Sequence, residues 1–395
     1  MDKEDEGVSL AKAARRLRWS AGLIAAALTL ILAACDGGEI PPPPDPQETF
    51  RFDTFGDESF WTDALHMDQV IAGAVDPVTA LSVGLKVDAE VLPEGILGTV
   101  DLNDPATTVE LLRLNAVVGV IGTFDESGDL AAVGITCALC HSTVDDSVMP
   151  GIGARLDGWP NRDLNPGAII SLSPFFDDKP DLRAQLQSWG PGYYDPYWNL
   201  DGISDPVLIP PAYGLRDVAL ETYTGEGPVS YWNAYVAVTQ MHGQGNFVND
   251  DLGIEIRHSP DLVTPKLPAL RTYQFGLEAP SAPPGSFDIA AAERGAAIFD
   301  GKAGCSSCHS GDSYTDAGER LHDAAETGMD PAYAARGTTG QYRTTPLRGA
   351  WQHAPYFHDG SAATLADVIE HYDSHFDLGL TVDESADLLE YLKSL

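Results

Sequence analysis

Two short motifs constrain this chain of 395 residues more than any other feature. Residues 137–141 read CALCH and residues 305–309 read CSSCH, so the pattern C-x-x-C-H occurs twice. This pattern is typical of covalent c-type haem attachment, in which both thiols form thioether bonds and the His binds the iron. We therefore predict two haem c groups. The predicted haem-binding residues are Cys137, Cys140, His141, Cys305, Cys308 and His309, with His141 and His309 as metal ligands.

Paired cysteines also occur in four-cysteine zinc sites, in redox-active disulfides and in structural disulfides. None of these sites requires a His directly after each pair. His makes up only 10 of the 395 residues, so its occurrence at both places by chance is rare. The sequence therefore favours haem attachment over the three alternatives.

The fifth cysteine, Cys35, ends an N-terminal segment with the features of an export signal. Basic residues precede an apolar run at positions 20–34. As a helix this run would span about 22 Å, short of the roughly 30 Å hydrocarbon core of a bilayer. The sequence LAAC at 32–35 resembles the lipobox of bacterial lipoproteins, in which the Cys carries the lipid. We predict a signal peptide over residues 1–35, with Cys35 as the lipid anchor; an uncleaved membrane anchor is the alternative.

The rest of the chain is then expected on the periplasmic side of a bacterial membrane, inner or outer. The prolines Pro41 to Pro44 and Pro46 predict a semi-rigid tether over residues 36–48. The formal net charge of −36 disfavours nucleic acid as a partner and would attract a basic protein if the charge is clustered. General solvation of the surface explains the same charge without any partner.

The patterns beyond the tether predict a mainly α fold with two cytochrome c-like haem domains, Gly- and Pro-rich irregular segments and a helical N-terminal extension. The N-terminal haem domain with this extension covers residues 49–277, where the apolar residues of 105–122 recur at helical spacing. Three prolines mark a linker at 278–287. A C-terminal cytochrome c domain follows at 288–395, and Thr381 with Glu384 predicts a capping box at the start of its last helix.

A faint internal repeat connects the two domains. Aligning Leu215 and Arg216 with Leu347 and Arg348 brings a helix-like segment after each haem motif into register. The repeat indicates that residues 232–247, which include Gln240, Met241 and His242, form the distal wall of the first haem or supply a ligand to it.

The C-terminal sequences RTTPLR (343–348) and APYFHDG (354–360) resemble the bacterial dihaem cytochrome c peroxidases and the related MauG proteins. The resemblance covers residues 288–395 well, whereas over 130–285 it depends on the first haem motif and the repeat. It implies that the N-terminal haem reacts with peroxide or O₂ and that the C-terminal haem transfers electrons. It also implies a Ca²⁺ ion between the domains.

The same resemblance implies a distal ligand for the second haem. The peroxidases place a Met fourteen residues after the His of this turn, and MauG places a Tyr there. Counting from His358, this chain has Tyr372 at that place. We predict Tyr372 as the iron ligand, with His371 and Met329 as alternatives, and expect His358 to shape the turn or to contact a haem propionate.

At the first haem the peroxidases commonly place a His about sixteen residues after the motif, where this chain has Asp157. An open distal site is therefore expected, which suits peroxide or O₂. Glu221, Glu226 and Gln240 are weak candidates for the catalytic group. The Trp that the family uses between its haems has three candidate positions, which are Trp159, Trp189 and Trp232.

Three functions are compatible with these features. The first is a peroxidase-like oxidoreductase that takes electrons from a small redox protein or from a membrane donor. The second is a dihaem electron-transfer cytochrome without catalysis. The third is a dihaem oxygenase that resembles the bacterial rubber oxygenases.

Overall fold

The computed structural model describes residues 43–395, and helices dominate their secondary structure, so the mainly α prediction is confirmed. The α-helices are α2 (Pro46–Phe52), α3 (Met67–Ala74), α4 (Pro77–Ser82), α5 (Pro105–Arg113), α6 (Ala138–His141), α7 (Pro166–Ser171), α8 (Pro180–Gln187), α9 (Trp198–Asp201), α10 (Val229–Tyr235), α11 (Leu267–Gly276), α12 (Ile289–Asp300), α13 (Ala324–Thr327), α14 (Leu365–Phe376) and α15 (Val382–Ser394).

The strands form short two-stranded ladders. The pairs are β1 (Val87–Asp88) with β5 (Ile152–Gly153), β2 (Val120–Phe124) with β3 (Leu130–Ile135), β4 (Ser142–Val144) with β6 (Arg155–Asp157), β7 (Tyr193–Tyr194) with β8 (Val207–Leu208), and β9 (Phe247–Asn249) with β10 (Ile254–Ile256). Only β1 and β5 are parallel among these pairs of the described chain. Most of the core therefore comes from helices and irregular segments.

Two helices begin or end elsewhere than the sequence predicts. Pro46 is not part of a tether but the first residue of α2, because the Asp45 side chain accepts hydrogen bonds from the backbone N–H groups of Gln47 and Glu48. The helical pattern predicted over 105–122 ends at Arg113, because Asn115 adopts a left-handed conformation with φ of 53°.

The predicted signal peptide, the lipid anchor Cys35 and the tether up to residue 42 lie outside the described residues. Within residues 43–395, no helix combines the length and apolar character needed to cross a bilayer.

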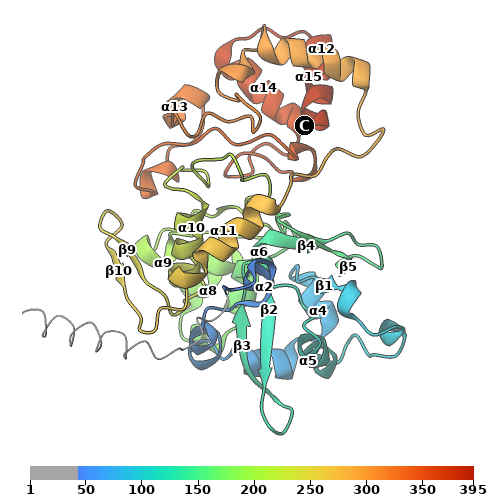
Figure 1. Cartoon of the computed structure of the whole chain (residues 1–395), viewed down its shortest axis with the longest axis vertical. Helices are drawn as coiled ribbons and strands as arrows, with labels where there is room; N and C mark the ends of the chain where they lie inside the picture. The colour runs from blue at the N-terminus through green and yellow to red at the C-terminus, as the bar shows by residue number, and fades with distance from the viewer. Residues whose placement is uncertain (1–42) are drawn as a thin grey trace, which may run out of the picture. The chain divides into compact units, whose positions relative to one another are not determined.

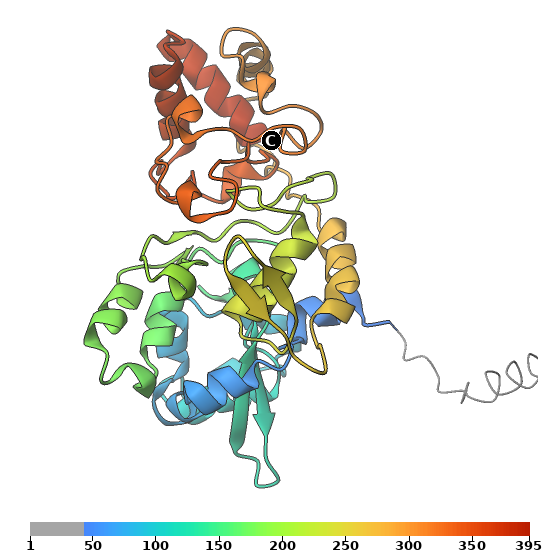
Figure 2. The same cartoon turned by 90° about the vertical axis from the view of Figure 1, so that its left-hand side faces the viewer.

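The C-terminal region, residues 288–395, contains a core formed by Phe299, Leu365, Ile369, Leu388 and Leu392. Figures 1 and 2 show α12, α14 and α15 together at one end of this part of the chain. The predicted capping box is confirmed, since the side chains of Thr381 and Glu384 each bond the other residue's backbone N–H.

The N-terminal region, residues 49–277, and the C-terminal region are joined by the irregular segment between α11 and α12. Residues 44–395 nevertheless form one compact unit. One buried cluster shows why, because Tyr197 and Tyr235 of the N-terminal region pack with Tyr333 and Tyr342 of the C-terminal region. The two regions therefore share part of their core.

Candidate haem centres

The first motif lines a cavity with a volume of about 520 Å³. This volume lies in the range of sites for cofactors and small ligands. The thiols of Cys137 and Cys140 are unbonded to each other or to other cysteines, and burial raises the pKa of each to about 12. Two free thiols on an apolar wall fit covalent attachment of a haem.

His141 adopts the tautomer that an iron ligand needs. Its Nδ1 lies 3.1 Å from the carbonyl oxygen of Pro210, and only an N–H can make that contact. Burial lowers the pKa of His141 to about 4, so the ring is neutral and its Nε2 carries a free lone pair. A carbonyl partner on one ring nitrogen is the usual support for a His that binds metal through the other.

The second motif repeats this arrangement. The Nδ1 of His309 lies 3.1 Å from the carbonyl oxygen of Tyr314, and burial lowers the pKa of His309. Cys305 begins a short 3-10 helix and has its pKa raised to about 11 by burial. Both motifs therefore present the donors that a haem c requires, in the same tautomer.

Tyr372 lies on α14, close to the second motif. Burial, followed by the nearby thiols of Cys305 and Cys308, raises the pKa of Tyr372 to about 12. The two alternatives are engaged elsewhere, because His371 Nε2 lies 2.8 Å from the carbonyl oxygen of Thr327 and Met329 packs on the cluster shared by the two regions. The arrangement favours Tyr372 as the distal residue of this site.

His358 is buried at the contact between the two regions. Its Nε2 lies 3.1 Å from the hydroxyl oxygen of Tyr342, and its carbonyl oxygen accepts a hydrogen bond of 2.8 Å from the N–H of Leu208. The turn beside it places Phe357 and Gly360 in left-handed backbone conformations. The expectation that His358 shapes the turn agrees with these contacts.

Gln240 lines the cavity of the first motif and ends a π-helical turn at Val236–Gln240. Its amide nitrogen donates to Thr239 Oγ1 at 2.8 Å and to Asn199 Oδ1 at 3.2 Å, while its Oε1 accepts from the hydroxyl of Tyr194 at 2.9 Å. Both N–H donors are used, so only one lone pair of Oε1 is left for a ligand. Gln240 can therefore accept a hydrogen bond from a ligand, but has no free donor for it.

The alignment of Leu215 with Leu347 also aligns Gln240 with Tyr372. The next two residues line the same cavity. Met241 is buried there, and His242 stacks on Phe60 with ring centroids 3.7 Å apart. Asp157 is absent from the cavity wall and instead bonds Arg51 and Tyr273.

Glu221 lies on the cavity wall, whereas Glu226 does not. The side chain of Glu221 is 7% exposed, and its Oε2 lies 3.2 Å from Nη1 of Arg343. Burial, partly offset by Arg343, raises the pKa of Glu221 to about 7. Its Oε1 and the Nε of Arg343 have no partner in the described chain. Glu226 instead accepts a hydrogen bond from the N–H of Thr338.

Sequence reasoning did not predict that the C-terminal region contributes side chains to this cavity. Tyr333 and Arg343 line it, although both belong to the C-terminal region. The only sequence signal was that Arg343 begins the RTTPLR motif. The first centre is therefore built from both regions.

The tryptophan candidates take different places. Trp189 and Trp232 line the first cavity, and Trp232 Nε1 has no partner in the described residues. Trp159 lies outside the cavity and meets Trp351 of the C-terminal region edge to face, with centroids 6.1 Å apart. Trp351 in turn donates a hydrogen bond to the carbonyl oxygen of Pro280 in the linker.

The cavity wall also includes three apolar side chains that are exposed to solvent, which are Leu172, Phe175 and Leu182. They come from the segment around α7 and α8. An exposed apolar group beside an apolar cavity is typical of a ligand entrance.

Comparison with known proteins gives partial matches. A family model described as "RoxA-like, cytochrome c-like" matches residues 340–374, which include Arg343, His358 and Tyr372. The methylamine utilization protein MauG of Methylorubrum extorquens is 35% identical over 118 residues, covering 26% of this chain and 33% of MauG. The cytochrome-c peroxidase IdrP1 of Denitromonas iodatirespirans is 30% identical over 153 residues, covering 27% of this chain and 40% of that protein.

The hydrazine synthase gamma subunit of Kuenenia stuttgartiensis is 31% identical over 175 residues, covering 33% of this chain and 49% of the subunit. The matches thus span a third to a half of the curated relatives' own length. Among solved structures, K. stuttgartiensis hydrazine synthase aligns with a TM-score of 0.35 at 23% identity over 48% of this chain and 73% of that chain. A MauG-like protein associated with microbial copper homeostasis aligns with a TM-score of 0.28 at 25% identity over 34% of this chain and 54% of that chain.

Proposed function

From the similarity of part of its sequence to MauG and to cytochrome-c peroxidases, we propose that this chain is a dihaem oxidoreductase whose N-terminal haem reacts with peroxide. The C-terminal haem transfers the electrons. The observation that carries the proposal is the buried carboxyl of Glu221 on the cavity wall, with one oxygen left without a partner. Such a group favours peroxide chemistry over pure electron transfer, because O–O cleavage needs a proton to be moved.

Two haem c groups are held by Cys137, Cys140 and His141 and by Cys305, Cys308 and His309. When bound, the first haem supplies an iron that can take up a peroxide oxygen and the second supplies electrons. Side chains of the protein carry out the proton transfer and the charge stabilisation.

Glu221 moves the proton. Reductive cleavage of hydrogen peroxide needs a proton taken from one oxygen and delivered to the other, which then leaves as water. A carboxyl with a pKa of about 7 exchanges protons readily near neutral pH in both directions. The guanidinium of Arg343 stabilises negative charge on the leaving oxygen, and Gln240 Oε1 accepts a hydrogen bond from the incoming peroxide.

Tyr372 binds at the second haem as a phenolate in this proposal. A hard anionic oxygen ligand stabilises the oxidised forms of iron and so lowers the reduction potential.

The protein acts on the periplasmic side of a bacterial membrane, held by a lipid on Cys35. Its acidic surface suits a small basic redox protein as electron donor, although a membrane donor serves equally.

A second candidate function is oxygenation of an apolar substrate with O₂. The match of residues 340–374 to the RoxA-like family and the exposed apolar side chains at the cavity favour it. Turnover measured with peroxide, and separately with O₂ plus an apolar substrate, distinguishes the two candidate activities.

Low-temperature EPR of the ferric protein tests the proposal. We expect one high-spin signal from an open first haem and one low-spin signal from the second, together with rapid reaction of the high-spin haem with peroxide. Two low-spin signals without any peroxide reaction would refute both enzymatic functions and leave the electron-transfer cytochrome.

A further inference from the structure

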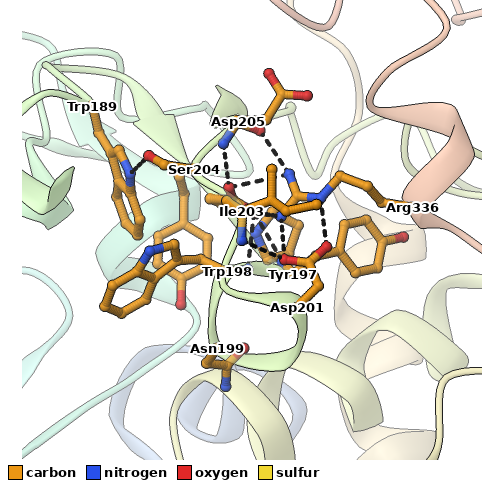
Figure 3. A network of polar contacts seen from close by, with 12 residues as sticks. Trp189, Tyr197, Trp198, Asn199, Asp201, Ile203, Ser204, Asp205 and Arg336 are labelled. Carbon is orange, nitrogen blue, oxygen red and sulfur yellow. Dashed lines mark hydrogen bonds and ion pairs between the residues drawn. The ribbon is translucent and has the colours of Figure 1, made fainter. Parts of the chain in front are cut away.

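Arg336 of the C-terminal region inserts its guanidinium into a loop of the N-terminal region, residues 195–205 (Figure 3). Its side chain is 5% exposed, and that of its partner Asp195 is fully buried. The guanidinium donates to Asp201 Oδ2 (2.8 Å), Asp201 Oδ1 (3.1 Å), Asp195 Oδ1 (2.9 Å), Asp195 Oδ2 (3.1 Å), the Ile203 carbonyl (2.9 Å) and the Asp205 carbonyl (3.2 Å).

The loop is shaped around this guanidinium. Asp195 also accepts hydrogen bonds from the N–H groups of Tyr197, Trp198 and Asp205, so its carboxylate fixes both ends of the loop. Gly202 allows the chain to reverse, because its φ of 71° is favoured only by glycine. Carboxylate and carbonyl oxygens that converge from one short loop are the ligand set that proteins use for Ca²⁺.

A Ca²⁺ ion does not fit this loop. All four carboxylate oxygens of Asp195 and Asp201 are occupied by the guanidinium, and a second cation there would meet a buried positive charge. In the described part of the chain, one group of three potential metal ligands lies close together, formed by Cys308, Asp316 and His322. Its thiol belongs to the second haem motif, and Ca²⁺ prefers oxygen ligands.

The position of Tyr333 gives the contact a functional consequence. Tyr333 is buried three residues before Arg336, lines the first cavity and lies 5.6 Å from the ring of Tyr197 between centroids. Arg336 also contacts Tyr197, with its guanidinium carbon 5.5 Å from the centroid of the Tyr197 ring. Anchoring Arg336 therefore also fixes Tyr333 on the cavity wall.

We propose that Arg336 is a built-in cation that docks the C-terminal region on loop 195–205, holds Tyr333 at the first haem cavity, and makes Ca²⁺ unnecessary at this contact. Arg336 is a positioning residue, since it does not line the cavity itself. The proposal is independent of whether the first haem reacts with peroxide.

The test uses the full haem-loaded chain and the variants Arg336→Ala, Arg336→Lys and Arg320→Gln. Arg320 is a matched control, because it pairs with Glu326 on the surface with its side chain 55% exposed. Thermal unfolding is followed with a chelator, with millimolar Ca²⁺ and with neither, and the EPR and absorption spectra of the first haem are recorded.

We expect the Tm of the unmodified protein to be the same in all three conditions. Arg336→Ala should lower the Tm by about 5 °C or more, because it leaves the buried charge of Asp195 uncompensated. Ca²⁺ should restore part of that loss, and the spectrum of the first haem should change as Tyr333 moves. The Tm of Arg336→Lys should lie between those of Arg336→Ala and the unmodified protein. The Tm of Arg320→Gln should equal that of the unmodified protein.

Several results would overturn the proposal. One such result is a chelator that lowers the Tm of the unmodified protein, together with about one Ca²⁺ per chain by metal analysis. It would show that the contact between Arg336 and loop 195–205 needs metal. Arg336→Ala with an unchanged first-haem spectrum would remove the link to Tyr333. If Arg336→Ala does not fold, Asp201→Asn takes its place, because Asp201 is 31% exposed and its loss should give a smaller shift in the same direction.

Discussion

Glu221→Gln is the substitution that tests the proposed chemistry most directly. It keeps the shape of the side chain and can still accept from Arg343, but it removes the group that exchanges a proton. General acid–base catalysis contributes about 10²- to 10⁴-fold to rates. We therefore expect kcat/KM for peroxide to fall by about 10²-fold or more.

The pH dependence gives a second measure of the same residue. The carboxylate form accepts the first proton, so kcat/KM should rise with pH and reach half its maximum near the pKa of about 7. This rise of kcat/KM with pH should be absent in Glu221→Gln. Stopped-flow reaction of the reduced protein with peroxide, from pH 5 to 9, measures both quantities.

Folding stability should follow the same titration. Raising a carboxyl pKa from 4.5 to about 7 corresponds to about 3 kcal/mol, at about 1.36 kcal/mol per pH unit. Because the folded-state pKa is the higher one, this contribution is fully present below pH 4.5 and is lost as the pH rises through about 7. The Glu221→Gln variant has no carboxyl that titrates in this range. Above pH 7 the difference in free energy of unfolding between the two proteins should therefore shift in favour of the variant.

Glu226→Gln is the matched control, since Glu226 is a half-buried carboxyl outside the cavity. Its kcat/KM should stay within about threefold of the unmodified value. The reasoning is wrong if Glu221→Gln stays within that same range and keeps the pH midpoint, or if Glu226→Gln abolishes the reaction while its fold is intact.

Three further changes test separate parts of the structure. Tyr372→Phe should alter the low-spin EPR signal of the second haem, and an unchanged signal would exclude Tyr372 as its ligand. Gly295→Ala should lower the Tm. The new Cβ would lie 2.1 Å from the carbonyl oxygen of Asp387, where α12 packs against α15. Overpacking of this kind costs about 1–3 kcal/mol. Gly73→Ala in α3 meets no atom within 4 Å and should leave the Tm equal or higher. Cys35→Ser should move the protein from the membrane fraction to the soluble fraction, and continued membrane association would contradict a lipid anchor.

The features that sequence predicted well are local. The capping box of Thr381 and Glu384 involves residues three positions apart, so its chemistry is visible in the sequence. The early end of α5 was not visible, because it depends on the left-handed conformation of Asn115.

The features that sequence could not predict are contacts between the two regions. Arg336 and Asp195 are 141 positions apart, and Arg343 and Glu221 are 122 apart. Each residue alone is an ordinary charged side chain of an acidic protein. The fold buries both members of each pair. Burial makes Arg336 and Asp195 a docking contact between the two regions, and burial raises the pKa of Glu221 beside Arg343.

The two C-x-x-C-H motifs hold their His residues in the same way, but the positions that the sequence repeat aligns with each other carry different side chains. Both His residues bind a backbone carbonyl through Nδ1, so the proximal sides are equivalent. The sequence repeat aligns Gln240 with Tyr372, and we propose both as distal residues. The amide of Gln240 is held by Tyr194, Asn199 and Thr239 and carries no ionisable proton, which makes it a poor iron ligand. A phenol can lose its proton to a metal, so in the proposed function Tyr372 would ligate the second haem iron, whereas Gln240 would leave the first haem open.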